Sequence, residues 1–352
     1  MVHAQEVVLS EDGIGIEGEN STKTAPVDEA IAGSVIFLQP DYKPHRFFTF
    51  TFQNDVFLNR DFGYTNGAGF TFGKGPFLSF DGNVNPLVDR LSRNLYIRTM
   101  PDKVHGIANM LFQRMQTPED LTISTPQLDD FPYVGLLALQ TTLYAYDRNQ
   151  SDQFSSYLGM VGPAALAEET QTFVHSIIGS EEPQGWDTQI DNELVFKLEA
   201  VRVKKLYRNY YSDNLGIDLV GIGHLGLGTI SSEALVGLAV RWGSNLEFSH
   251  ATFSLQPDRQ VNSLTLSPSN NFFTFVGVQG GYFANDIMID GNTFRDSQSI
   301  PLRHEYNQVT AGVVFKHGKL SYVAQVTEAN SRSTINSERL QYGAFSVTWN
   351  LK

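Results

Sequence analysis

The chain contains no cysteine among its 352 residues, which excludes disulfide bonds and thiolate metal sites. It also has few basic residues: 25 Lys and Arg stand against 38 Asp and Glu, giving a net charge of −13. Since no basic patch is available to neutralise phosphates, we expect no nucleic-acid partner. No run approaches the roughly 18 apolar residues that a membrane-spanning helix requires. A transmembrane β-barrel stays open, because its alternating strands escape a search for apolar runs.

The N-terminal part of the chain differs in composition from the rest. Residues 1–43 are acidic and rich in turn-forming residues, with a single apolar patch at residues 35–38. We predict an acidic N-terminal extension over residues 1–43 and a β-barrel domain over residues 44–352. The chain opens without a basic, apolar secretion signal, and residues 3–5 resemble what remains after such a signal is cleaved, with the first Met added for expression.

Period-two alternation begins abruptly at Phe48. The stretch FTFTFQND alternates aromatic with polar side chains, and Asp55 at its end falls on the polar face by parity. In the next stretch, TNGAGFTFG, Thr65 belongs to a face of small and polar residues that lies opposite the phenylalanines. Such a face is typical of the inside of a barrel. Because the two strands are consecutive, we expect them to pair and to bring Asp55 near Thr65.

Similar alternation continues to the C-terminus, and about twelve strands are predicted, one of them at residues 94–100. The last strand places Phe345, Val347, Trp349 and Leu351 on one side, as a lipid-facing strand would. Aromatic residues recur near strand ends, and the opposite faces are rich in Gly, Thr, Ser, Asn and Gln. The predicted fold class is therefore all-β: a closed antiparallel transmembrane β-barrel of about 12 strands with one short helix at the active site. A soluble lipid-binding β-barrel is the alternative.

One helix is predicted within residues 162–193. Pro163 suits its first position, and Gly179 suits the left-handed residue just after its end. Gln171 and His175 lie four residues apart, so both project from one face, and Glu181 follows directly after the helix.

This helix is where we expect chemistry. If it packs into the barrel mouth, His175 could reach Asp55 and Thr65. A histidine whose other ring nitrogen is hydrogen-bonded can take a proton from water. Asp55 and Glu181 could hold an oxygen-preferring cation such as Ca²⁺. A purely structural histidine is the alternative interpretation. The remaining histidines lack comparable companions and are expected at surfaces or turns: His45, His105, His224, His250, His304 and His317.

Several stretches resemble the outer-membrane lipid A 3′-O-deacylase (LpxR) family. They are QNDVF with Asn54 and Asp55, YTNG with Thr65, TPEDL, DDFPYVG, VGPAALAEETQTFVHSIIGSEEPQGWDTQI and IDGNTF, in family order. The resemblance implies a 12-stranded barrel in the bacterial outer membrane and Ca²⁺-dependent ester hydrolysis that removes the 3′-acyloxyacyl group of lipid A.

The resemblance also implies roles for individual residues. His175 would be the general base. Asn54, Asp55 and Gln171 would orient His175, the water or the metal shell. Thr65 would support that network, and Glu181, with Asp55, would be a candidate cation ligand.

One departure concerns the loop that begins at Thr117, where the family is expected to carry a lysine that stabilises the oxyanion. No Lys or Arg occurs between Thr117 and Asp130. The cation alone, or another residue such as Arg114, would have to take that place, or activity would differ. We expect a monomeric hydrolase acting on lipid A or lipopolysaccharide. The alternative is a non-enzymatic outer-membrane barrel, either a narrow pore or a structural protein with a decayed site.

Overall fold

A computed structural model describes residues 44–54, 66–100, 103–212, 215–246, 249, 254–255, 270–335 and 338–351. The predicted N-terminal extension lies outside these residues. So do two predicted site residues, Asp55 and Thr65.

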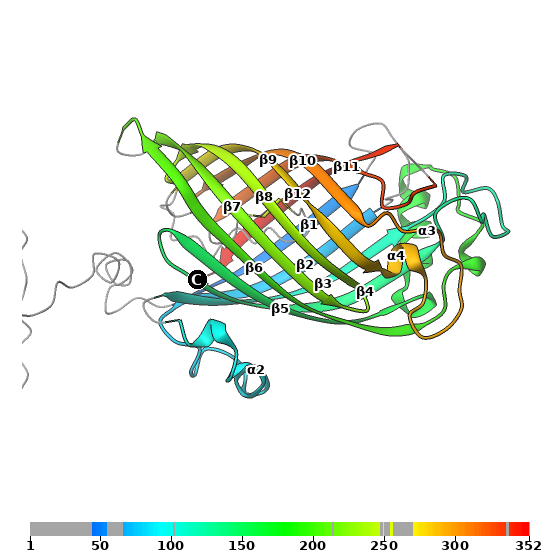
Figure 1. Ribbon diagram of the computed structural model, residues 1–352, viewed down its shortest axis with the longest axis horizontal. Coiled ribbons are helices and arrows are strands. Elements are labelled where there is room, and N and C mark those ends of the chain that lie inside the picture. Colours follow the sequence, from blue (N-terminus) through cyan, green and yellow to red (C-terminus); the bar gives the residue numbers. More distant parts are fainter. Residues whose placement is uncertain are drawn as a thin grey trace, which may run out of the picture.

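Twelve antiparallel strands form one closed barrel, which confirms the predicted fold class (Figure 1). The strands are β1 (His45–Asn54), β2 (Asn66–Phe77), β3 (Val104–Gln116), β4 (Val134–Tyr146), β5 (Gln150–Val161), β6 (Glu193–Tyr210), β7 (Leu215–Gly228), β8 (Ser231–Ser244), β9 (Asn270–Asp286), β10 (Glu305–His317), β11 (Leu320–Asn330) and β12 (Arg339–Leu351). Each strand pairs with its sequence neighbours, and β1 pairs with β12 to close the ring. No described strand is therefore left with an unpaired edge.

Short helices lie in the connections between strands: α2 (Pro86–Ser92), α3 (Ala167–Ile178) and α4 (Ile287–Asp290). Figure 1 shows α3 and α4 at one end of the barrel, hereafter the loop end, and the C-terminus at the other, hereafter the terminal end. None of the described helices is both long and apolar enough to cross a membrane. The sequence predicted the region of α3 but neither α2 nor α4.

Two local predictions need correction. Pro163 begins a separate 3-10 turn, η3 (Pro163–Ala165), and α3 starts only at Ala167, after Leu166 in a left-handed conformation. The strand predicted at residues 94–100 is wrong, because Tyr96–Arg98 forms the 3-10 turn η2. Ile97 in this turn is buried against the barrel wall. The short alternation of apolar residues in this stretch therefore reflects packing of a turn on the wall and not pairing of a strand.

The predicted alternation of faces is confirmed by burial. On β2, Phe70 and Phe72 are 45% and 58% exposed, whereas Thr71 between them is 1% exposed. On β12, Phe345 and Trp349 face outward, whereas Thr348 is fully buried. Apolar side chains face outward and small polar ones face the lumen, as a membrane-spanning barrel requires.

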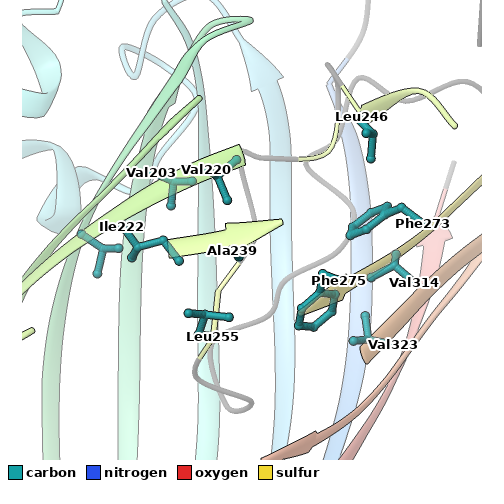
Figure 2. Close-up of a cluster of buried hydrophobic side chains, with 11 residues drawn as sticks. Val203, Val220, Ile222, Ala239, Leu246, Leu255, Phe273, Phe275, Val314 and Val323 are labelled. Carbon is teal, nitrogen blue, oxygen red and sulfur yellow. The ribbon is translucent and has the colours of Figure 1, made fainter. Parts of the chain in front are cut away.

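The lumen near the terminal end is nevertheless filled with apolar side chains (Figure 2). Inward-facing Val203, Phe273 and Phe275 pack with Leu246 and Leu255, which come from the connection between β8 and β9. The Leu255 carbonyl also accepts a hydrogen bond from Gln308 Nε2 at 3.1 Å. Part of this connection therefore folds into the barrel and occupies its lumen.

A buried ion pair fixes this inserted connection to the wall. Arg241 Nε and Nη2 donate to Asp218 at 2.8 and 2.5 Å, and both side chains are entirely buried. The same guanidinium donates to the Leu246 carbonyl and to the Ser249 hydroxyl at 3.0 and 3.1 Å. A planar guanidinium can serve all of these acceptors at once, which a lysine cannot.

We predict that Arg241→Met destabilises the barrel by about 3–5 kcal/mol, because it leaves the Asp218 carboxylate buried without its cation. The double variant Arg241→Met/Asp218→Leu should recover much of that loss. Urea unfolding in lipid vesicles, followed by tryptophan fluorescence, measures both. A single variant as stable as the parent would contradict this assignment.

Candidate active site

Helix α3 packs against the outer face of the barrel wall at the loop end. It does not pack into the barrel mouth, which was the condition under which His175 was expected to reach Asp55 and Thr65. A Cβ at Gly135 of β4 would lie 2.5 Å from the Cβ of Ala167, so only glycine permits this approach. Gly135 has the same parity as lipid-facing Leu139, which places it on the outside. Gln113 of β3 also donates to the carbonyl of Ala165 at 2.7 Å. The helix is thus held where the wall meets lipid.

A small apolar core lies between α3 and the wall. It consists of Met115, Leu121, Tyr133, Ala167 and Trp186. The Tyr133 and Trp186 rings meet edge to face with centroids 5.0 Å apart. These two residues belong to the DDFPYVG and PQGWDTQI stretches noted in the sequence. Those stretches therefore build the support of the site.

Gln171 is tied to that core. The Trp186 indole N–H donates to Gln171 Oε1 at 2.8 Å, and Gln171 is 2% exposed. This contact fixes which end of the amide is oxygen. The Gln171 Nε2 is buried and has no acceptor among the described residues. Buried donors are nearly always satisfied, so Gln171 Nε2 is suited to donate to a bound molecule.

His175 lies in the last turn of α3. The N–H groups of Gly179 and Ser180 both donate to its carbonyl, at 2.8 and 3.2 Å, and Gly179 is left-handed as predicted. The His175 ring Nδ1 lies 2.5 Å from the backbone carbonyl oxygen of Glu181. Because a carbonyl only accepts, Nδ1 carries the proton, and Nε2 of the neutral ring keeps a lone pair.

His175 borders an open cleft of about 700 Å³, hereafter the acidic cleft. Its other lining residues come from the β3–β4 connection and from the chain after α3: Glu119, Asp120, Leu121, Ile123, Gln127, Asp130, Ser180 and Glu181. Four carboxylates and no Lys or Arg occur among these described lining residues. Such a site attracts cations and supplies the hard oxygen ligands that Ca²⁺ prefers.

The charge state of this region follows from its hydrogen bonds. The Thr122 hydroxyl and N–H donate to Asp120 Oδ1 at 2.6 and 2.9 Å, and these bonds lower the pKa of Asp120. Burial raises the pKa of Glu168 at the start of α3, and Glu169 and Asp187 raise it further. Asp120 therefore stays ionised at neutral pH, whereas the start of α3 carries excess negative charge.

Asn54 reaches the same side of the molecule through strand register. It pairs with Asn66 of β2, which in turn pairs with Met115 of β3. At about 4.8 Å per strand, Asn54 lies roughly 10 Å from Met115, which packs beside α3. Asp55 and Thr65 lie outside the described residues. The structure thus brings Asn54 toward α3 and joins His175 to the Glu181 carbonyl, whereas Gln171, one turn earlier on the same helix, contacts Trp186.

The IDGNTF stretch also has a structural explanation. Asn292 exchanges two hydrogen bonds with the backbone of Asp191, at 2.8 and 2.9 Å. Glu193 accepts from the N–H groups of Thr293 and Phe294 at 3.1 Å each. The β9–β10 connection therefore clamps the chain that returns from α3 to β6.

Some residues of the acidic cleft were missed from the sequence. Glu119, Asp120 and Asp130 lie within TPEDL and DDFPYVG, so the motifs were visible but their roles were not. Arg114, offered as a substitute for the missing lysine, faces a cavity of about 150 Å³ inside the barrel. It does not line the acidic cleft.

A second charged cluster lies inside the barrel. Glu199, His224 and Glu233 are buried, and their ligand atoms lie within 4.8 Å of one another, so they could hold a metal ion. The Lys197 ammonium, however, already contacts both carboxylates and donates to Ser231 Oγ at 3.0 Å. A site with one imidazole and a resident ammonium suits Ca²⁺ poorly compared with the acidic cleft.

Two of the histidine expectations were wrong. His224, in the middle of β7, is 3% exposed, and His105, in β3, is 5% exposed. His105 stacks on Phe77 and meets Phe80 edge to face, whereas His224 is held by carboxylates. The residues that contact each histidine are distant from it in the sequence, so no local sequence pattern indicated that either histidine is buried.

Comparison with known families gives one match. The model of the family described as "Outer membrane protein LpxR" matches residues 24–351. The match thus begins inside the predicted N-terminal extension. A comparison with curated protein sequences found no match.

Solved structures also resemble the barrel. LpxR from Salmonella typhimurium superposes with a TM-score of 0.71 at 13% identity, covering 87% of this chain and 100% of that one. The β domain of the Bordetella autotransporter BrkA gives 0.41 at 8% identity, covering 87% and 98%. The translocator domain of NalP from Neisseria meningitidis gives 0.37 at 9% identity, covering 92% and 94%. The first of these shows a shared fold.

We predict that Gly135→Val displaces α3 while leaving the barrel folded, because the added methyl groups collide with Ala167 and a β-branched residue suits a strand. Hydrogen exchange at residues 167–178 should become several-fold faster. Leu139→Val, on the same strand and face but in the lipid-facing region, is the matched control. Unchanged exchange in Gly135→Val would show that the helix is held in another way.

Proposed function

Because this chain belongs to the LpxR family of outer membrane proteins, we propose that it is a lipid A 3′-O-deacylase that uses Ca²⁺ and His175 as general base. The observation that carries the proposal is the position of His175. Its Nε2 lone pair is fixed by the Nδ1 contact with Glu181, beside a cleft of carboxylates on the lipid-facing side of the wall.

His175 Nε2 would accept a proton from water as the oxygen attacks the ester carbonyl. The tetrahedral intermediate then collapses, the bond to the sugar oxygen breaks, and the protonated imidazole returns the proton to that leaving oxygen. The Glu181 carbonyl supports this cycle, because it holds Nδ1–H and stabilises the imidazolium. No covalent enzyme intermediate is required.

The other proposed residues would position these partners. Gln171 Nε2, buried and without a described acceptor, is suited to donate to the attacking water or to the Asp55 carboxylate. Asn54 would contribute an amide from the end of β1. Thr65 would support Asp55 across the β1–β2 connection.

The acidic cleft fits Ca²⁺ by the chemistry of its donors. Glu181 would hold the ion together with Asp55, and the Glu181 carboxylate has no side-chain partner within the described ranges. Bound Ca²⁺ would polarise the ester carbonyl and stabilise the oxyanion. The positive charge of Ca²⁺ would be needed to stabilise the oxyanion, because Arg114 faces the lumen and no Lys or Arg is among the described residues that line the acidic cleft.

The place of α3 favours a membrane lipid as substrate. The helix lies on the outer face of the wall, so an ester in the adjoining leaflet can approach sideways without passing through the barrel. The apolar filling of the lumen near the terminal end disfavours the pore alternative. All the proposed residues come from one chain, and we propose that the protein acts as a monomer.

We predict that detergent-solubilised protein removes a 3′-acyloxyacyl mass from purified lipid A only with Ca²⁺, as read by mass spectrometry. His175→Ala should slow the reaction by about 100- to 10,000-fold, the usual contribution of a general base. His317→Ala, an exposed histidine at the terminal end, is the matched control. Full activity of His175→Ala would refute the base assignment. Unchanged lipid with stable bilayer conductance would favour the non-enzymatic barrel.

A second prediction concerns the cation. Glu181→Gln keeps the backbone carbonyl that holds His175 but removes a charged ligand, so the Ca²⁺ midpoint of activity should rise about tenfold or more. Activity at saturating Ca²⁺ should be largely retained. Glu182→Gln, one residue further and outside the cleft lining, should leave the midpoint unchanged. Equal midpoints in both variants would exclude Glu181 as a ligand.

A further inference from the structure

A small helical segment covers the outer face of the wall near the terminal end. This α2 segment, residues 78–100, contains α2 and η2 and projects beside the barrel in Figure 1. Phe80 and Ile97 are buried against Ile107 of β3 and Leu143 of β4. Ile107 and Leu143 share parity with Leu111 and Leu139, which are each 49% exposed on the lipid-facing side. The segment is thus seated on the same surface that contacts lipid.

The free side of the segment is apolar. Leu78, Leu87 and Leu91 are 64%, 66% and 72% exposed, and Leu87 and Leu91 lie four residues apart on one side of α2. The other side is charged and internally tied: Asp89 pairs with Arg93 at 3.0 Å and with Arg98 at 2.9 Å. This is the pattern of a helix that lies in a membrane interface.

The height of the lipid-facing wall supports this position. On β4, Gly135 is covered by α3 and Leu143 by the α2 segment, about eight residues apart. With about 3.3 Å per residue and a tilt of about 40°, that distance is roughly 20 Å along the barrel axis. The apolar band of an outer-membrane barrel is about 25 Å tall. A band of this height, centred on lipid-facing Leu139 midway between the two rows, therefore reaches both α3 and the α2 segment.

Charged residues mark where the band ends on this side. Asp152 of β5 accepts from Lys103 at 2.9 Å and from Arg202 of β6 at 2.6 Å. Asp152 pairs in register with Arg202 on one side and with Ala145 of β4 on the other, and Ala145 lies two residues from Leu143 toward the terminal end. The row at Leu143 consequently lies just inside the apolar band, at the level of the α2 segment.

We propose that the α2 segment is an interfacial anchor that inserts Leu87 and Leu91 into the lipid leaflet at the terminal end of the barrel. Exposed Arg90 and Arg93 lie at the level of the lipid phosphates. The occupant of the apolar face is lipid because the face continues the lipid-facing wall on the same strands. This anchor is independent of hydrolysis, since it lies at the end of the barrel opposite α3.

The absence of cysteine makes the test direct, because any introduced cysteine is the only one labelled. Leu87→Cys and Leu91→Cys would carry an NBD fluorophore in vesicles of phosphatidylethanolamine and phosphatidylglycerol. Arg93→Cys, on the charged side of α2, is the matched control. Heat-dependent migration in gels shows that each variant is folded. The readouts are the emission maximum and quenching by lipids that carry a doxyl group on the acyl chain.

Labels at positions 87 and 91 should emit at shorter wavelength and be quenched several-fold more strongly than the label at position 93. Equal, water-like emission at all three positions would overturn the proposal. The proposal would also be overturned if the labels at positions 87 and 91 were shielded from water only at a high ratio of protein to lipid. Loss of shielding on dilution would show that a second copy of the protein, and not lipid, covers the apolar face.

Discussion

The barrel depends on one constraint: in a bilayer, every backbone N–H and C=O must find its partner within the protein. Twelve strands meet it because β1 and β12 pair along their length and leave no edge. Closure then divides side chains into two environments. The exposed leucines, valines and phenylalanines face lipid, and the lumen receives threonine, glutamine and the buried ion pairs together with the apolar cluster near the terminal end. The continuous wall also provides a rigid outer surface on which both α2 and α3 are placed.

The two covering segments use that surface differently. Helix α3 approaches the wall closely at Gly135, and its contacts hold Gln171 against Trp186 and place His175 beside the acidic cleft. The α2 segment instead buries its aromatic and isoleucine side chains and leaves leucines exposed. A site outside the wall at the loop end, and an apolar face at the terminal end, both fit a protein that works on lipids rather than one that conducts solutes. The lumen agrees, since Leu246 and Leu255 occupy it.

Much of the fold was predictable because strand alternation is local. FTFTFQND places its phenylalanines outward and its threonines inward in the structure as in the sequence. The same reasoning failed at residues 94–100, where alternation over a short stretch reflects packing of Ile97 under a turn. The expectation for His224 was wrong for a different reason: its carboxylate partners come from the neighbouring strands β6 and β8, so they are not visible as companions in the sequence. The site was predicted in part: Gln171 and His175 share a helical face, whereas Trp186 and Asp120 meet them only through the fold.

The sequence by itself determined the barrel, its inside and outside, and the helix that ends at Gly179, because periodicity and turn chemistry act between near neighbours. Only the tertiary structure decided that α3 lies outside the wall rather than in its mouth, that Arg114 faces the lumen, and that one carbonyl, that of Glu181, fixes the His175 tautomer. Those outcomes depend on strand register and on close approach between segments distant in the chain, which no local pattern encodes.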